Sequence, residues 1–162
     1  MIMPLIKIFD SKTAVHDNKA LTSRQNEQAD KICIHIILSA RKKTGCFLEI
    51  RDGSVYEKSE CKIVVKIWNE LYKSYPGLEF GDYYFESDNF HSIISLKNDA
   101  KIDPRKAIPK AVGELKSRST LLLNKYHNLY GRVFWENGYR EIMFTDNGRI
   151  GNLLDYFWKH PA

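Results

Sequence analysis

The segment LEFGDYYFESDNFHSIISL, Leu78 to Leu96, contains the two strands and the turn that decide the fold. Residues 78–86 and 90–96 are rich in aromatic and β-branched side chains, which favour extended backbone. Ser87, Asp88 and Asn89 lie between them, and such a polar group is typical of a turn. The segment therefore predicts two consecutive strands joined by a short connection.

A further strand and a hairpin are predicted on the amino-terminal side of this segment. From Lys31 to Ala40 apolar side chains occupy both alternating faces, which indicates a strand that is buried on both sides. His35 lies among isoleucines there and is interpreted as a core histidine with its hydrogen bonds satisfied. The pair Asp52 and Gly53 stands between two short apolar runs and indicates a tight hairpin.

Helical periodicity appears in two longer segments. Apolar residues recur at helical spacing from Ser59, a candidate N-cap, to Tyr75, before Pro76 and Gly77 end the pattern. A second helix is expected from about Arg105 to about Tyr126. Proline is tolerated only in the first turn, so Pro109 leaves open a later start, at residue 108 or 109.

The rest of the chain is expected to add two short strands and a closing helix. Residues 133–135 and 139–144 are predicted as strands that pair with each other around 136–138. The closing helix is expected to begin at Asp146 or Asn147, to end before Pro161 and to carry Tyr156.

This order of elements predicts an α+β fold, a ferredoxin-like antiparallel sheet with helices packed on one face. Residues 31–162 would form the domain. Residues 1–30 are interpreted as an N-terminal tail or appendage, because they are mostly polar and lack strong apolar periodicity.

Composition narrows the class of protein. The chain has 162 residues, a net charge of +5 and 43% hydrophobic residues, which suits one domain and favours a polyanionic partner. Its three cysteines lack metal-ligand spacing, and the positions of Cys33 in a strand and Cys61 at a helix start favour buried thiols, which indicates a reducing cytoplasm. No apolar run is long enough to span a membrane, and no secretion signal is visible.

The closing helix carries a tyrosine and a histidine at a suggestive spacing. Asn152, Tyr156 and His160 are four residues apart and share one edge of the helix. A tyrosine hydroxyl can attack a phosphodiester when a divalent metal polarises the phosphate, and imidazole can hold that metal. The alternative is that Tyr156 is an amphipathic rim residue and His160 a helix-end cap.

A second possible half of the site lies in the predicted strand after the turn. Asn89 and His91 point to the same face, because side chains alternate along a strand. They could present an amide oxygen and an imidazole to one cation. The alternative is that both residues serve only the turn.

Cations for phosphate contact are concentrated in two segments. Lys116, Ser117 and Arg118 lie in the second helix, and Arg41, Lys42 and Lys43 form a basic loop. These groups are typical of phosphate contacts, although such a charge run is often only a solvated face.

Four segments together resemble the HUH-type single-strand transposases, most closely the REP-associated tyrosine transposases and their insertion-sequence relatives. The family strand motif N-H-x-H corresponds to Asp88–Ile94, and its F-K-S helix motif to Leu115–Ser117. The W-Q-R-x-Y segment corresponds to Trp135–Tyr139, and the closing Y-I-x-x-N-P to Tyr156–Pro161. The resemblance covers roughly residues 31–161.

The resemblance implies a metal-dependent endonuclease and strand transferase that acts on single-stranded or hairpin DNA. Tyr156 would be the nucleophile, and His91, Asn89 and His160 would hold Mg²⁺ or Mn²⁺. The Trp135–Tyr139 segment, including both end residues, would lie along the DNA. Insertion-sequence relatives act as dimers and REP-associated ones as monomers, so a monomer or homodimer is expected.

The chain departs from the family pattern at several positions. Asn89 replaces the first histidine of the pair, which predicts a weak metal site. Glu136 and Asn137 replace Gln-Arg and reverse the local charge, and Ile142 stands where a histidine is common. Two alternatives therefore remain, a catalytically degenerate DNA-hairpin-binding protein on the same fold and an RNA-binding ferredoxin-like module.

Overall fold

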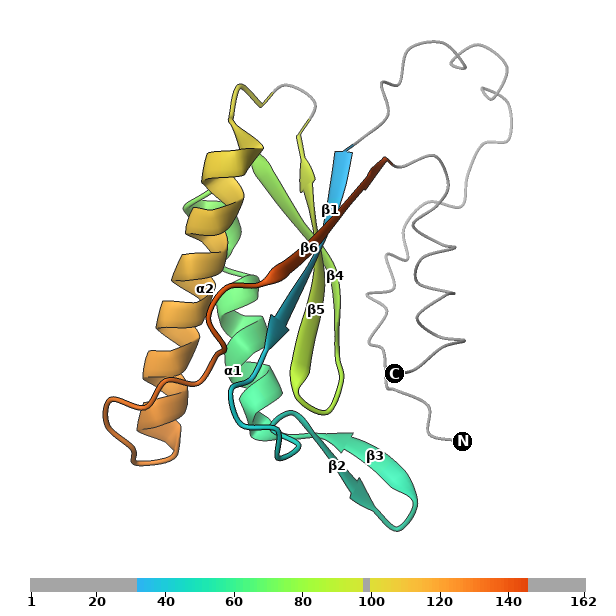
Figure 1. Ribbon diagram of the computed structural model, residues 1–162, viewed down its shortest axis with the longest axis vertical. Helices are drawn as coiled ribbons and strands as arrows, with labels where there is room; N and C mark the ends of the chain where they lie inside the picture. Colours follow the sequence, from blue (N-terminus) through green and yellow to red (C-terminus); the bar gives the residue numbers. More distant parts are fainter. Residues whose placement is uncertain (1–31, 98–99, 146–162) are drawn as a thin grey trace, which may run out of the picture.

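Two helices cover one face of a four-stranded antiparallel sheet (Figure 1). The computed structural model describes residues 32–97 and 100–145. Its strands are β1 (Ile32–Ser39), β2 (Leu48–Arg51), β3 (Ser54–Glu57), β4 (Leu78–Phe85), β5 (Asn89–Leu96) and β6 (Arg140–Thr145). Its helices are α1 (Ser59–Trp68), the short 3-10 helix η1 (Leu71–Lys73) and α2 (Pro104–Tyr126). The predicted α+β class and antiparallel sheet are confirmed.

The strand order is β4-β5-β1-β6, with β5 and β1 in the centre. Ile36 of β1 lies opposite Ser92 of β5, and Ile37 lies opposite His91. Strand β1 lies in the centre of the sheet and is buried on both faces, which explains its nearly unbroken apolar run. The strands β2 and β3 form a separate hairpin, whose turn residues Asp52 and Gly53 both have positive φ, as predicted for this dipeptide.

The hydrophobic core lies between the sheet and the two helices. Large side chains from every layer are fully buried there, and they include Ile34, Ile36, Leu38, Phe90, Ile94, Trp68, Leu71 and Leu115. Trp68 of α1 contacts Phe90 of β5 edge to face, at 5.6 Å between ring centroids. Dense apolar packing of this kind is the main source of fold stability.

Strand β4 contains a bulge at Gly81 and Asp82. Phe80 pairs with Ile94, but the next pair is Tyr83 with Ser92, so β4 has one extra residue. Trp68 donates its indole N–H to the carbonyl oxygen of Gly81 at 3.2 Å. After the bulge the odd-numbered side chains of β4 face the core, and the even-numbered ones face the other side of the sheet.

Two predictions about the ends of α1 are wrong. Helix α1 ends at Trp68 and the chain tightens into η1, because Asn69 and Glu70 leave the α-helical pattern. Ser59 is the first helical residue, whereas the N-cap is Lys58, which makes no side-chain cap. Helix α2 spans Pro104–Tyr126, which confirms the predicted range of about Arg105 to about Tyr126, whereas the later start at residue 108 or 109 is wrong. Asp103 caps the helix by accepting a hydrogen bond from the Arg105 amide at 3.0 Å. Pro109 is consequently inside this helix rather than at its start.

The two short strands predicted around 136–138 do not pair with each other. Trp135 instead forms an isolated antiparallel bridge with Ala40, and β6 pairs with β1 from Arg140 onward. The two segments therefore pair with β1 in succession, because the backbone groups along this side of β1 need hydrogen-bonding partners.

The closing helix, with Tyr156 and His160, and the tail at residues 1–30 lie outside the described residues. Within the described ranges, no helix combines the length and the apolar character required to cross a bilayer.

Candidate functional site

Five polar side chains gather on the sheet face that α1 and α2 do not cover. We call them the histidine cluster. Its members are His35 from β1, Tyr84 from β4, Glu86 just after β4, and Asn89 and His91 from β5. His91 Nδ1 lies 3.1 Å from His35 Nε2 and 2.9 Å from the Tyr84 hydroxyl. The Tyr84 and His91 rings stack with centroids 4.3 Å apart, so three strands fix the position of His91.

Glu86 joins the two residues that the sequence proposed as metal ligands. One of its oxygens, Oε2, lies 3.2 Å from His91 Nε2 and accepts a hydrogen bond from Asn89 Nδ2 at 2.9 Å. The other end of the Asn89 amide, Oδ1, accepts from the Ser39 hydroxyl at 2.7 Å. Asn89 and His91 therefore lie on the same face, as expected, and a carboxylate lies between them.

Burial controls the protonation of this cluster. His35 is 2% exposed, and burial, aided by repulsion from His91, lowers the pKa of its imidazole to about 4. The hydrogen bond from His91 lowers the pKa of Glu86, against the opposing effect of its burial. Burial and the nearby Glu86 carboxylate raise the pKa of Tyr84. At neutral pH the cluster therefore contains a neutral His35, a neutral Tyr84 and an ionised Glu86.

His35, Tyr84 and Glu86 are the members that sequence reasoning missed. His35 is buried as expected, and its imidazole lies against that of His91 in the neighbouring strand. The available signal was that His35 and His91 both lie mid-strand in runs that are buried on both faces. No local pattern pointed to Glu86, because the bulge in β4 decides on which face of the sheet its side chain lies.

The predicted phosphate contacts in α2 are engaged within the protein. The Lys116 ammonium donates to the carbonyl oxygens of Glu136 and Gly138, and burial lowers its pKa. Arg118 forms ion pairs with Glu70 and with Glu114. The exposed Ser117 lies between them. In this structure Lys116 and Arg118 tie α2 to its neighbours.

The predicted aromatic contacts lie in or near the core. Trp135 is 2% exposed, and its indole N–H donates to the buried Ser119 hydroxyl at 2.8 Å. Tyr139 is half-buried and packs against the core, and burial raises its pKa. Neither ring is placed as an open stacking platform.

The basic loop after β1 is exposed. Arg41, Lys42 and Lys43 all have exposed side chains, and Lys43 pairs with Glu136 at 3.1 Å. This loop remains the most accessible of the predicted cationic segments.

The donor set of the histidine cluster fits a weakly held divalent cation. Glu86 and His91 supply a carboxylate and an imidazole, and Asn89 would add its amide oxygen after turning that oxygen toward Glu86. A group of three or more His, Cys, Asp or Glu residues suited to a metal is absent from the described part of the chain. Two strong ligands and one amide are fewer than tight sites use.

Comparison with known proteins gives structural likeness without sequence likeness. No protein-family model matches the chain, and no curated protein matches it. A structure described as a "putative transposase" from Deinococcus radiodurans R1 is 16% identical over 80% of this chain and 90% of that chain, with a TM-score of 0.46.

A REP-associated tyrosine transposase bound to a REP hairpin is 10% identical, over 84% of this chain and 70% of that chain. Its TM-score of 0.53 indicates a shared fold.

Proposed function

We propose that this chain is a transposase-like DNA-binding protein that cuts and transfers single-stranded or hairpin DNA, with Tyr156 as its nucleophile. The observation that carries the proposal is the convergence of Glu86, Asn89 and His91 on the sheet face opposite α1 and α2. The shared fold with a tyrosine transposase bound to a REP hairpin supports a DNA substrate.

The reaction would be a transesterification. The Tyr156 oxygen forms a bond to the scissile phosphorus, the bond from phosphorus to the 3′ oxygen breaks, and the product is a 5′-phosphotyrosine link. The phenol proton passes to solvent, and the leaving 3′ oxygen takes up a proton. Mg²⁺ or Mn²⁺ would polarise the phosphate and stabilise the leaving oxygen.

The residues of the chain would hold and orient that cation. Glu86 and His91 would be its main ligands, and Asn89 and His160 would complete the set. Tyr84 and His35 would fix His91 through its Nδ1 side, which leaves Nε2 directed toward Glu86.

A second function is favoured by one observation: the polar groups of Asn89 already have protein partners. Its Oδ1 accepts from Ser39 and its Nδ2 donates to Glu86, so a cation would have to displace existing hydrogen bonds. The second candidate is a catalytically silent protein that binds DNA hairpins on the same scaffold.

The two functions are separated by nicking of a labelled hairpin oligonucleotide in the presence of Mn²⁺. The enzyme would form a covalent protein–DNA adduct that Tyr156→Phe abolishes. Tyr72→Phe is the matched control, because Tyr72 is an exposed tyrosine on η1. Binding without an adduct, at any Mn²⁺ concentration, would exclude the nuclease and favour the silent protein.

A further inference from the structure

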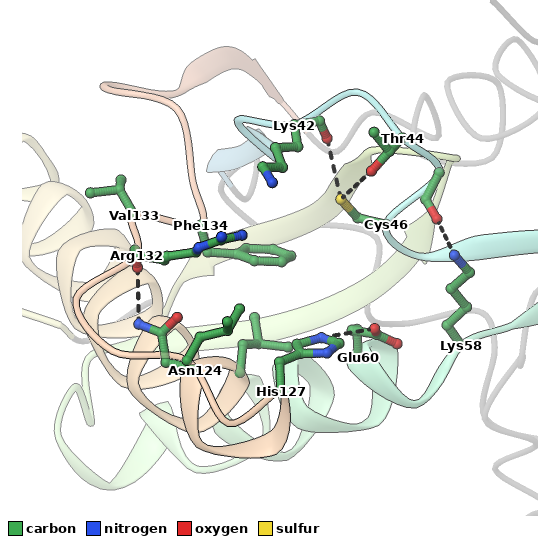
Figure 2. Close-up of a pocket in the computed structure, with 13 residues that line it drawn as sticks. Lys42, Thr44, Cys46, Lys58, Glu60, Asn124, His127, Arg132, Val133 and Phe134 are labelled. Carbon is green, nitrogen blue, oxygen red and sulfur yellow. Dashed lines mark hydrogen bonds and ion pairs between the residues drawn. The ribbon is translucent and has the colours of Figure 1, made fainter.

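A cavity of about 260 Å³ lies at the end of α2 (Figure 2). Its walls come from the loop after β1, the start of α1, the last turns of α2 and the loop at 127–134. The volume lies slightly below the usual range of small-molecule sites, so a ligand the size of one nucleotide suits it.

The cavity carries an excess of positive charge. Lys42, Lys58 and Arg132 line it, and Glu60 is the acidic residue in its wall. Glu60 is engaged by His127 at 3.0 Å. Within the described ranges, neither the Lys42 ammonium nor the Arg132 guanidinium has an ion-pair partner, so both can contact a phosphate.

The remaining wall is apolar and includes an aromatic ring. Leu123, Leu129 and Phe134 contribute side chains that a nucleobase could pack against. The same loop exposes Tyr130, which is 96% exposed, and Tyr126 stands 53% exposed at the end of α2. Exposed aromatic rings beside cations are typical of surfaces that bind single-stranded nucleic acid.

A hydrogen bond connects the cavity to the turn between β4 and β5. The amide of Cys46, a lining residue, donates to Asp88 Oδ1 at 2.9 Å, and Asp88 directly precedes Asn89. A strand held in the cavity would therefore lie near the turn that precedes Asn89.

We infer that this cavity binds one unpaired nucleotide of single-stranded DNA, with the phosphate at Lys42 and Arg132 and the base against Phe134. The inference rests on the proposed function, because it assigns a place to the same substrate. It adds a contact that positions the strand relative to the histidine cluster.

Chemical protection of Cys46 tests occupancy directly. Cys33 and Cys61 are each 1% exposed, so N-ethylmaleimide should react first with Cys46, and Cys46→Ala should remove that reaction. A saturating oligothymidylate should slow modification of Cys46 several-fold. An unchanged rate at saturation would overturn the inference.

Binding of the same fluorescent oligothymidylate tests the charges. Lys42→Ala and Arg132→Ala should each weaken binding about tenfold and lower the salt-dependence slope by about 1. Lys106→Ala is the matched control, because it removes an exposed lysine at the opposite end of α2 and should leave binding unchanged. Equal losses in all three variants would indicate non-specific attraction and contradict a defined site.

Nucleotide binding in the cavity and DNA cleavage by Tyr156 can fail independently of each other. Tyr156→Phe should leave protection of Cys46 intact, so protection without nicking would overturn the nuclease alone. Nicking without protection would overturn the cavity inference alone. An oligouridylate that binds more tightly than the oligothymidylate would overturn the assignment to DNA.

Discussion

Along β5, Phe90 and Ile94 point toward the helices, whereas Asn89 and His91 point to the opposite face. The first pair packs against other apolar side chains, where any well-fitting hydrocarbon would serve. The second pair makes hydrogen bonds at defined distances to side chains from two other strands. One face of the strand thus packs in the hydrophobic core, and the other carries side chains of the hydrogen-bonded histidine cluster.

The largest difference between the faces should appear in stability. Phe90→Ala removes a fully buried ring and should lower the free energy of unfolding by about 3–5 kcal/mol. Asn89→Ala, one residue away, should cost only about 1–2 kcal/mol, the value of its hydrogen bonds. Urea denaturation measures both, and similar losses would contradict the division between the faces.

The polar face should make stability depend on acid pH. The pKa of His35 is about 4 in the folded chain, below the ordinary 6.5, so the unfolded chain binds more protons between these values. Stability should therefore fall as pH drops from 6.5 to 4, by up to about 3 kcal/mol from this group. His35→Gln should flatten that part of the pH profile. An unchanged profile would show that His35 does not titrate as described.

The buried hydrogen bond between Trp135 and Ser119 tests the comparison within the hydrophobic core. Ser119→Ala would leave the buried indole N–H of Trp135 without its acceptor and should cost about 1–3 kcal/mol. Ser117→Ala, on the exposed side of the same helix, should change stability by less than about 0.5 kcal/mol. Thermal unfolding followed by circular dichroism would reveal the difference, and equal effects would assign no role to the Trp135 contact.

The smallest effect concerns the metal. Asn89→His would replace the amide by an imidazole and should tighten Mn²⁺ binding about tenfold, or about 1.4 kcal/mol, by titration calorimetry. Glu86→Gln in the same background should reverse the gain, because it removes the carboxylate. Asn137→His, in an exposed loop, is the control. If Asn89→His and Asn137→His bind alike, Asn89 does not face a cation position.

The local sequence pattern predicted much of the fold and part of the histidine cluster. Alternation along 78–96 predicted β4 and β5, and the same alternation placed Asn89 and His91 on one face. Capping and pairing were less predictable, because Asp103 could be recognised as a cap only once α2 was known to start beside it.

Long-range contacts account for what local pattern missed. His35 and His91 are 56 residues apart, and nothing near either residue encodes the register that joins them. The same holds for Arg118, which reads as a free cation in the sequence but pairs with Glu70, 48 residues away. The histidine cluster is a product of strand register, which forms only when the whole sheet assembles.

The extra residue in β4 resets which positions of the strand face the helices. Before the bulge Leu78 and Phe80 pack in the core, and after it Tyr83 and Phe85 do, so alternation counted straight through from Leu78 would assign Tyr84 and Glu86 to the wrong face. Deleting Gly81 or Asp82 would remove the bulge and leave the pairing on both sides as it is, with Tyr84 still opposite His91. A related chain that is one residue shorter here could therefore keep the whole histidine cluster.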